Sequence, residues 1–234
     1  MKYTYGPIHS RRLGLSLGVN ITPGRTCSLN CIYCEEAVPT KNLTLKRSEY
    51  APKNQVIEEI KKKATPKLDY ITFSGEGEPT LHSKLGYIIE KIKGLNIPIA
   101  VLTNSTLLHL EEVRQDLYNA DLVVPSLDAI FEKSFKKVNR PCPGIELETI
   151  LKSLQEFCQK HQGNILIEIL LVQGLNDSLE EVKEIAGFVN ELPVNGVQLN
   201  TLSRRPTAPG ARPVPLNKLE EYKEYFKHPV KIYD

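Results

Sequence analysis

Residues 16–34 read SLGVNITPGRTCSLNCIYC, which joins a short apolar strand pattern to three closely spaced cysteines. The apolar run 16–21 predicts a buried strand, which the residues Thr-Pro-Gly at 22–24 should stop. The loop that follows has a Cys-x3-Cys-x2-Cys spacing made by Cys27, Cys31 and Cys34. Because three thiolates so close in sequence can converge on one centre, we expect a metal site at the end of this strand.

The number of cysteines indicates the kind of metal site. An electron-transfer iron-sulfur cube normally takes four cysteines, so three leave one iron open to a ligand that is not protein. A structural zinc ion would need four Cys or His ligands, and the nearest candidates, His9, His82 and His109, would have to come from elsewhere in the fold. A disulfide framework fits poorly with five cysteines in 234 residues. We therefore favour an iron-sulfur cluster, with zinc and buried free thiols as alternatives.

The rest of the chain alternates strand patterns with amphipathic helix patterns, which indicates repeated βα units and a parallel sheet. The expected strands are 16–21, 69–74, 97–103, 121–125, 165–172 and 197–200. The expected helices are 48–64, 85–93, 108–117, 145–162, 178–191 and 216–226. Six units are too few to close an eight-stranded barrel. We predict an α/β fold, a partial (βα)6 barrel with an open, curved, mostly parallel sheet.

We expect one domain over residues 1–234, with an N-terminal extension (1–15), a partial barrel core (16–200) and a C-terminal loop and helix (201–234). In sheets of this kind, ligands gather at the carboxyl ends of the strands. Polar or glycine-rich residues follow the second, third and fourth expected strands, namely Gly75, Glu76, Gly77, Glu78, Asn104, Ser126 and Asp128. Each also has a purely structural interpretation, as a turn or a helix cap. Inside the later strands, Glu168, Gln198 and Asn200 either line the interior or have a structural role.

The cysteine spacing, with Tyr33 just before the last cysteine, resembles that of the radical S-adenosylmethionine (SAM) superfamily. The turn 75–79, Gly-Glu-Gly-Glu-Pro, resembles the motif with which that family holds the methionine ammonium of SAM. It departs from the commoner Gly-Gly-Glu-Pro by one intervening residue. Glu76 and Glu78 are therefore both candidates for the ammonium contact, and we favour Glu78.

This resemblance implies a [4Fe-4S] cluster on the three cysteines, with SAM chelated at the open iron. It also implies that Tyr33 lies near adenine and that strand-end polar residues contact the ribose and carboxylate of SAM. We assign these contacts to Asn104, Ser126 and Asp128, and include Glu168 and Asn200 among the cofactor-binding candidates.

The family mechanism is reductive cleavage of SAM to a 5'-deoxyadenosyl radical, which abstracts hydrogen from a substrate. The low potential that this requires implies an external electron donor, a flavodoxin or a ferredoxin. Two alternatives stay open: an activase that makes a glycyl radical on a partner enzyme, and a non-catalytic iron-sulfur electron carrier.

The N-terminal residues, the cysteine loop and residues 74–81 together resemble a branch of iron-sulfur oxidoreductases grouped with the tRNA wyosine synthetases. Two arginine pairs suit an anionic substrate, either a small molecule or a tRNA, because guanidinium forks match phosphate and carboxylate. They are Arg11 with Arg12, and Arg204 with Arg205 near Arg212; the alternative is that they are solvated surface residues. Cys142 is a candidate radical participant or a packing residue, and Cys158 is expected in the core.

Composition limits the other classes of function. A net charge of +2 is too small to indicate nucleic acid by itself, so we expect no DNA partner. No apolar run approaches the roughly 18 residues that span a bilayer, and the N-terminus lacks a signal-peptide pattern. Together with thiolates that must stay reduced, this predicts a cytoplasmic protein without a membrane partner.

Overall fold

The computed structural model describes residues 2–34, 36, 38–203 and 206–233. The strands are β1 (Thr4–Ser10), β2 (Gly14–Val19), β3 (Thr26–Cys27), β4 (Asn42–Leu43), β5 (Tyr70–Phe73), β6 (Ile99–Thr103), β7 (Leu122–Pro125), β8 (Asn164–Leu171), β9 (Gly196–Thr201) and β10 (Val230–Tyr233). The helices are α1 (Lys53–Lys63), α2 (Leu85–Ile92), α3 (Glu111–Leu117), α4 (Glu132–Val138), α5 (Leu147–Lys160), α6 (Leu179–Asn190) and α7 (Leu216–Lys223), with short 3-10 turns η1 (Pro79–Leu81) and η2 (Lys93–Leu95).

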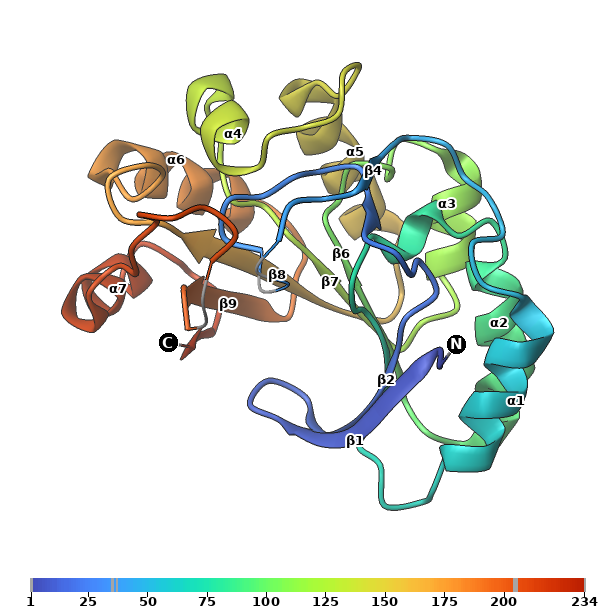
Figure 1. Cartoon of the computed structure of the whole chain (residues 1–234). Helices are drawn as coiled ribbons and strands as arrows, with labels where there is room; N and C mark the ends of the chain where they lie inside the picture. The colour runs from blue at the N-terminus through green and yellow to red at the C-terminus, as the bar shows by residue number, and fades with distance from the viewer. Residues whose placement is uncertain (1, 35, 37, 204–205, 234) are drawn as a thin grey trace.

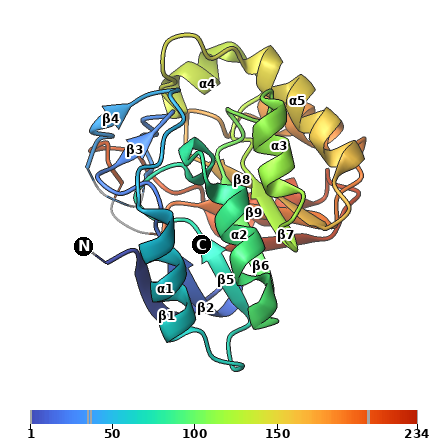
Figure 2. The ribbon, with the colours of Figure 1, turned by 90° about the vertical axis from the view of Figure 1, so that its right-hand side faces the viewer.

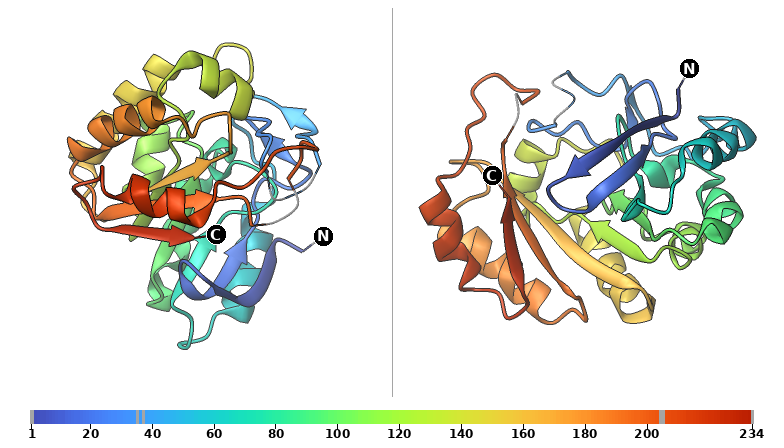
Figure 3. Two further views of the ribbon diagram at one scale, coloured as in Figure 1. Left: turned by 90° about the vertical axis from the view of Figure 1, so that its left-hand side faces the viewer. Right: turned by 90° about the horizontal axis from the view of Figure 1, so that it is seen from below.

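Eight strands form one curved sheet in the order β1-β2-β5-β6-β7-β8-β9-β10 (Figure 1). All neighbours from β2 to β10 pair in parallel, and β1 pairs antiparallel to β2. Strands β1 and β10 are the two edges, so the sheet stays an open half-barrel, as the view from below in Figure 3 shows. This confirms the predicted fold class.

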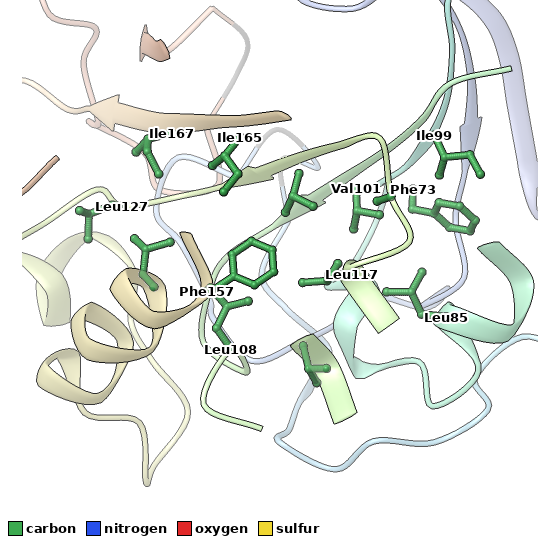
Figure 4. Packing of buried hydrophobic residues seen from close by; sticks show 14 of the residues in the cluster. Phe73, Leu85, Ile99, Val101, Leu108, Leu117, Leu127, Phe157, Ile165 and Ile167 are labelled. Carbon is green, nitrogen blue, oxygen red and sulfur yellow. The ribbon is translucent and has the colours of Figure 1, made fainter. Parts of the chain in front are cut away.

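Helices cover the convex face of the sheet (Figure 2). Because strand side chains alternate between faces, every second residue points toward the helices and forms the main apolar core. Phe73, Ile99 and Val101 of the strands meet Leu117 of α3 and Phe157 of α5 there (Figure 4). This core holds the strand ends in fixed positions.

The concave face has an apolar floor and a polar middle. Leu13, in the turn between β1 and β2, packs with Ala100, Leu122 and Val124 in a separate apolar cluster. Further along the strands, Ser16 Oγ bonds Thr72 Oγ1 at 2.6 Å, and both side chains are buried. The N-terminal hairpin therefore closes the lower end of the half-barrel.

Besides the 3-10 turns, five elements were not among the predicted ones, namely β1, β3, β4, α4 and β10. Helix α1 also begins later than the predicted 48, because Pro52 is its N-cap and the backbone of Ser48 bonds to Leu81 and Ser83 instead. Strand β1 lies in the predicted extension, and β10 follows the last predicted helix. None of the helices in the described part of the chain has the length and apolarity to cross a membrane.

Candidate functional site

Three thiols lie on the loop after β2, which we call the cysteine loop (residues 22–34). Cys27, Cys31 and Cys34 are all half-buried. Burial, helped by the charges of Glu78 and Cys34, raises the pKa of Cys27 to about 12. Burial, then the charges of Asp128 and Cys27, raises the pKa of Cys31 well above the usual range. The pKa of each of these two thiols is therefore raised in part by the charge of another cysteine of the loop.

This donor set fits a metal cluster. Thiolates in such surroundings need a compensating positive charge, which a bound cluster provides. The sulfurs of three cysteines are soft ligands that suit an iron-sulfur cluster, and they leave one iron for a ligand that is not protein. The described residues contain no group of three His, Cys, Asp or Glu side chains set to hold a single metal ion.

Hydrogen-bond donors point at two of the sulfurs. The Leu29 amide and Asn104 Nδ2 each donate to Cys27 Sγ at 3.4 Å. Asn139 Nδ2 lies 3.6 Å from Cys31 Sγ. Donors of this kind stabilise the charged sulfur and help to set the reduction potential of a bound cluster. The two asparagines therefore belong to the site.

The glycine turn 75–79 packs directly on the cysteine loop. The Glu78 amide donates to the Thr26 carbonyl at 3.0 Å. A Cβ on Gly77 would lie 2.0 Å from that carbonyl oxygen and 2.8 Å from the carbonyl oxygen of Thr22. Gly75 has φ +120°, a conformation that side chains rarely adopt. Glycine is thus required twice in this turn, by close approach and by backbone conformation.

The two glutamates of the turn differ in their surroundings. Glu78 is buried, and its Oε1 accepts hydrogen bonds from Thr80 and Thr103, while Oε2 accepts one from the Asn104 amide at 2.7 Å. Burial raises the pKa of Glu78, although these bonds oppose the shift. Glu76 is exposed and accepts from the Gly24 amide at 2.9 Å. Of the carboxylate oxygens in this turn, only Oε2 of Glu78 combines a buried position with a spare lone pair. That Glu78 contacts the methionine ammonium of SAM stays a prediction.

Asp128 is buried and holds Tyr33 in place. Its Oδ2 accepts from the Tyr33 hydroxyl and from Asn139 Nδ2, and Oδ1 accepts from the Leu170 amide at 2.9 Å. Burial raises the pKa of Asp128 to about 6. Because three donors already use its oxygens, a ribose contact at Asp128 would have to displace or share one of them.

Asn104 and Ser126 flank a small cavity of about 10 Å³ behind the cysteine loop. That volume is close to the space of one water molecule. Asn104 is fixed by bonds from Nδ2 to Ser28 Oγ and from Thr106 to its Oδ1. The Ser126 carbonyl accepts from Ser105 Oγ. Both residues lie where the sequence predicts, at the ends of β6 and β7.

Three asparagines have a buried Oδ1 without a partner among the described residues, namely Asn20, Asn139 and Asn200. Such atoms are costly unless water or a ligand bonds them. Asn20 follows β2, Asn139 follows α4, and Asn200 lies in β9. Asn20 and Asn139 are not among the site residues predicted from the sequence. Asn20 carries the same signal as Asn104, a polar residue at a strand end, whereas nothing in the sequence marks Asn139.

Arg12, a predicted substrate residue, lies beside Glu168 and Asn200, which the sequence suggests for cofactor binding. Its Nη1 pairs with Glu168 Oε1 and lies 3.3 Å from Gln198 Oε1. Asn200 Nδ2 donates to the same Glu168 oxygen at 2.7 Å. Arg12 therefore carries a charge already balanced by a carboxylate of the chain. This interior group of Arg12, Glu168, Gln198 and Asn200 lies on the concave face.

Arg11 and Arg212 make other contacts. Arg11 Nη2 donates to Ser203 Oγ at 2.8 Å. Arg204 and Arg205 lie outside the described residues. Arg212 is exposed, and its carbonyl accepts from the Gln173 amide.

The loop after β9 packs on the cysteine loop. Thr207 Oγ1 donates to the Cys34 carbonyl at 3.0 Å, and the Ala208 amide donates to the Ile32 carbonyl at 2.9 Å. Cys142 lies on the outer side of the cysteine loop, where its amide donates to the Ser28 carbonyl. Cys158 is buried in α5, as predicted, and burial raises its pKa to about 12.

Comparisons with known proteins agree with this arrangement. The family model of the radical SAM superfamily matches residues 21–189. A protein of Brachyspira hyodysenteriae named GTPase Obg is 38% identical over 229 residues, which cover 97% of this chain and 34% of that protein. A UPF0026 protein of Methanocaldococcus jannaschii is 37% identical over 217 residues, 91% of this chain and 67% of that protein. The chain thus spans about a third of the first relative and two thirds of the second.

Solved structures share the fold. Streptococcus suis SuiB bound to S-adenosylmethionine has a TM-score of 0.70 at 16% identity, covering 93% of this chain and 50% of that one. TYW1 with a lysine-pyruvate adduct has a TM-score of 0.64 at 16% identity, covering 89% of this chain and 72% of that one. At such identities the likeness concerns the fold alone.

Proposed function

The chain belongs to the radical SAM superfamily, and we propose that it abstracts hydrogen from a small polar substrate bound on the concave face of its sheet. Enzymes of this superfamily use a [4Fe-4S] cluster and SAM. When bound, these groups supply one-electron cleavage of SAM, the source of a radical that abstracts hydrogen. The observation that carries the proposal is the contact of the glycine turn with the cysteine loop beside a polar concave face.

We assign the cofactor contacts to residues of the strand ends. Cys27, Cys31 and Cys34 would hold three irons. The backbone of 75–77 and Oε2 of Glu78 would hold the methionine ammonium, because carbonyls and a carboxylate complement a cation. The unpartnered Asn20 Oδ1, which lies against Gly75, suits a hydrogen-bond donor of the same ligand.

The substrate would lie above the interior group. The charges of Arg12 and Glu168 cancel, so this geometry favours a neutral or zwitterionic polar molecule over the strongly anionic one that the arginine pair alone suggests. The free Oδ1 of Asn200 suits an N–H or O–H of the substrate. Because the N-terminal hairpin closes the lower end of the face, a small molecule is favoured over a tRNA base or a partner's glycine loop.

Deuterium transfer tests this function. Anaerobic, reconstituted enzyme is reduced chemically in extracts from cells grown in deuterated medium, and 5'-deoxyadenosine is analysed by mass spectrometry. We expect deuterium in the nucleoside from a small molecule, and a loss of about tenfold or more of that transfer in Arg12→Gln and Asn200→Leu. Arg212→Gln, at an exposed position, is the control.

The two competing functions give different results. Transfer only from a tRNA fraction would support RNA modification, and transfer only with a protein that gains a glycyl radical would support an activase. Unchanged transfer in both interior variants would contradict the proposed substrate position.

A further inference from the structure

An open groove lies on the outer side of the cysteine loop. Its volume is about 570 Å³, and it is lined by Asn30, Leu43, Lys136 and residues 140–145. We call it the outer groove. In Figure 1, α4 and β4, which contribute Lys136 and Leu43 to its lining, lie near the top of the molecule, away from the hairpin of β1 and β2.

The inner wall of the outer groove is the cysteine loop itself. The Asn30 amide donates to the carbonyls of Asn139 and Arg140 at 3.0 and 3.1 Å. Leu29 pairs with Pro141 through an isolated bridge. Asn30 also directly precedes Cys31 in the chain. A molecule seated in the groove would therefore be separated from a bound cluster only by this short layer of backbone.

Apolar packing links the same wall to the thiols. Leu29 packs with Phe135 of α4 and Leu147 of α5, and Cys27 and Cys31 pack against this cluster. The start of α4 is anchored to α6, because the buried Glu181 accepts bonds from the Ile130 and Phe131 amides and from Ser134. The groove is thus a fixed feature of the fold.

Positive charge predominates around the outer groove. Its lining residues include the basic Lys136 and Arg140 and no Asp or Glu. The neighbouring segments 38–46 and 133–145 add four more basic residues, and Glu132 and Glu146 flank the second segment; the six basic residues are Lys41, Lys46, Lys133, Lys136, Lys137 and Arg140. All six are exposed. Within the described part of the chain, Lys136 with Glu132 is the ion pair formed by this set. A net positive field over a concave surface attracts an acidic partner and raises its rate of encounter.

We propose that the outer groove is the docking site for an acidic electron-carrier protein that reduces the cluster. This inference rests on the proposed function, since only a redox-active cluster needs a donor. The reduced carrier would lose one electron and so be oxidised, and the cluster that the three cysteines would hold would gain that electron and be reduced, with no bond formed or broken.

A basic groove also suits RNA. The protein donor is favoured because the groove faces the outer side of the cysteine loop, while the glycine turn and the interior group lie with the concave face. A substrate in the outer groove would be on the wrong side of the loop to meet SAM. An electron donor needs only to come near the cysteines.

The test measures carrier binding and electron delivery separately, in the full chain. Lys136→Glu/Arg140→Glu reverses the two charges that line the groove, and Lys61→Glu/Lys62→Glu makes the same charge change on the exposed face of α1. Flavodoxin binding is measured by titration calorimetry at low and high salt. SAM cleavage is measured with reduced flavodoxin and, in parallel, with dithionite.

We expect the groove variant to lose flavodoxin affinity and flavodoxin-driven cleavage by about tenfold or more, with the dithionite rate unchanged. The control should match wild type, and wild-type binding should weaken with salt. Arg140→Gln, a milder change, should give a smaller loss of the same kind if the double variant folds poorly.

Other outcomes would overturn the proposal. One is a groove variant that binds flavodoxin as wild type does. Another is an equal loss of flavodoxin affinity in the groove variant and the control. A third is a groove variant that loses tRNA binding but keeps flavodoxin-driven cleavage. Absence of dithionite-driven cleavage in wild type would instead contradict the proposed function, while salt-sensitive flavodoxin binding at the groove would still support docking.

Discussion

Single residues explain why this cysteine loop keeps its shape. Gly77 allows the glycine turn to lie against the carbonyls of Thr22 and Thr26, and Asn104 and Asn139 direct donors at two cysteine sulfurs. Each contact is made by a residue far from the cysteines in sequence. The site therefore depends on a few close approaches between neighbouring strand ends.

Gly77→Ala should separate the glycine turn from the cysteine loop. The added Cβ would lie 2.0 Å from the Thr26 carbonyl oxygen, which is backbone and cannot rotate away. We expect a loss of about 2 kcal/mol in the free energy of unfolding, together with loss of SAM binding. Urea denaturation and equilibrium dialysis with SAM measure the two effects.

Gly94→Ala is the matched control, because a Cβ there meets nothing within 4 Å. It should change the free energy of unfolding by less than about 1 kcal/mol. Equal losses in both variants would show that the close approach at Gly77 has no special cost.

His82 should make stability sensitive to mild acid. It is fully buried, its Nε2 bonds the Ala51 carbonyl at 2.8 Å, and its Nδ1 accepts from the Lys84 amide at 3.1 Å. Burial lowers the pKa of His82 below the usual 6.5. The neutral ring is therefore favoured in the folded state. Its contribution to the free energy of unfolding is complete above pH 6.5, the unfolded-state pKa, and is lost as the pH falls from there toward the lower folded-state pKa.

Urea denaturation at pH 7.5 and 5.5 measures this effect. Wild type should lose more free energy of unfolding between the two values than His82→Gln does. His9→Gln, which removes an exposed imidazole, should behave like wild type. An equal loss in wild type and His82→Gln would rule out His82 as the cause.

At the level of elements, the parallel core could be predicted because the apolar residues of each strand and helix recur with the period of that element. The six predicted strands correspond to β2, β5, β6, β7, β8 and β9. Strands β1 and β10 lie at the edges of the sheet, where one side lacks a neighbour and the residue pattern is weak. Helix α4 has only two turns, so its three buried residues are too few to show a helical period in the sequence.

The same distinction applies to the candidate site. Cysteines and glycines carry their signal in local spacing, so the cysteine loop and the glycine turn could be found in the sequence. The partners of Asp128 and Arg12 could not, because they come from the cysteine loop, the residue after α4, β8 and β9, and depend on how the sheet curves. Asn139 and the pairing of Arg12 with Glu168 are tertiary contacts without a local pattern.

The hairpin of β1 and β2 should contribute stability through its turn. Leu13 is 7% exposed and fills the floor of the half-barrel against Ala100, Leu122 and Val124. Leu13→Ala should lower the free energy of unfolding by about 3 kcal/mol, since it leaves a cavity. Ile8→Ala, at a position 44% exposed, should change it by less than about 0.5 kcal/mol in the same urea titration. A small effect at Leu13 would mean that the floor relaxes to fill the cavity.

On the scale of the whole molecule, the open half-barrel separates three regions to which we assign different roles. The cysteine loop lies at the strand ends, the interior group lies on the concave face, and the outer groove lies behind the loop. Electrons, cofactor and substrate would then approach from different sides and meet at one point. The loop after β9 fixes this arrangement by bonding the backbone of Cys34 and Ile32.

We propose above all that the three cysteines hold a cluster that cleaves SAM. The most direct measurement is the yield of 5'-deoxyadenosine from SAM by the anaerobically reconstituted, dithionite-reduced protein, compared between wild type and Cys31→Ala, with Cys158→Ala as the control for a cysteine outside the loop. We predict cleavage by wild type and by Cys158→Ala, and none above background by Cys31→Ala. Wild-type protein that holds a reduced cluster and yet never forms 5'-deoxyadenosine would contradict the claim.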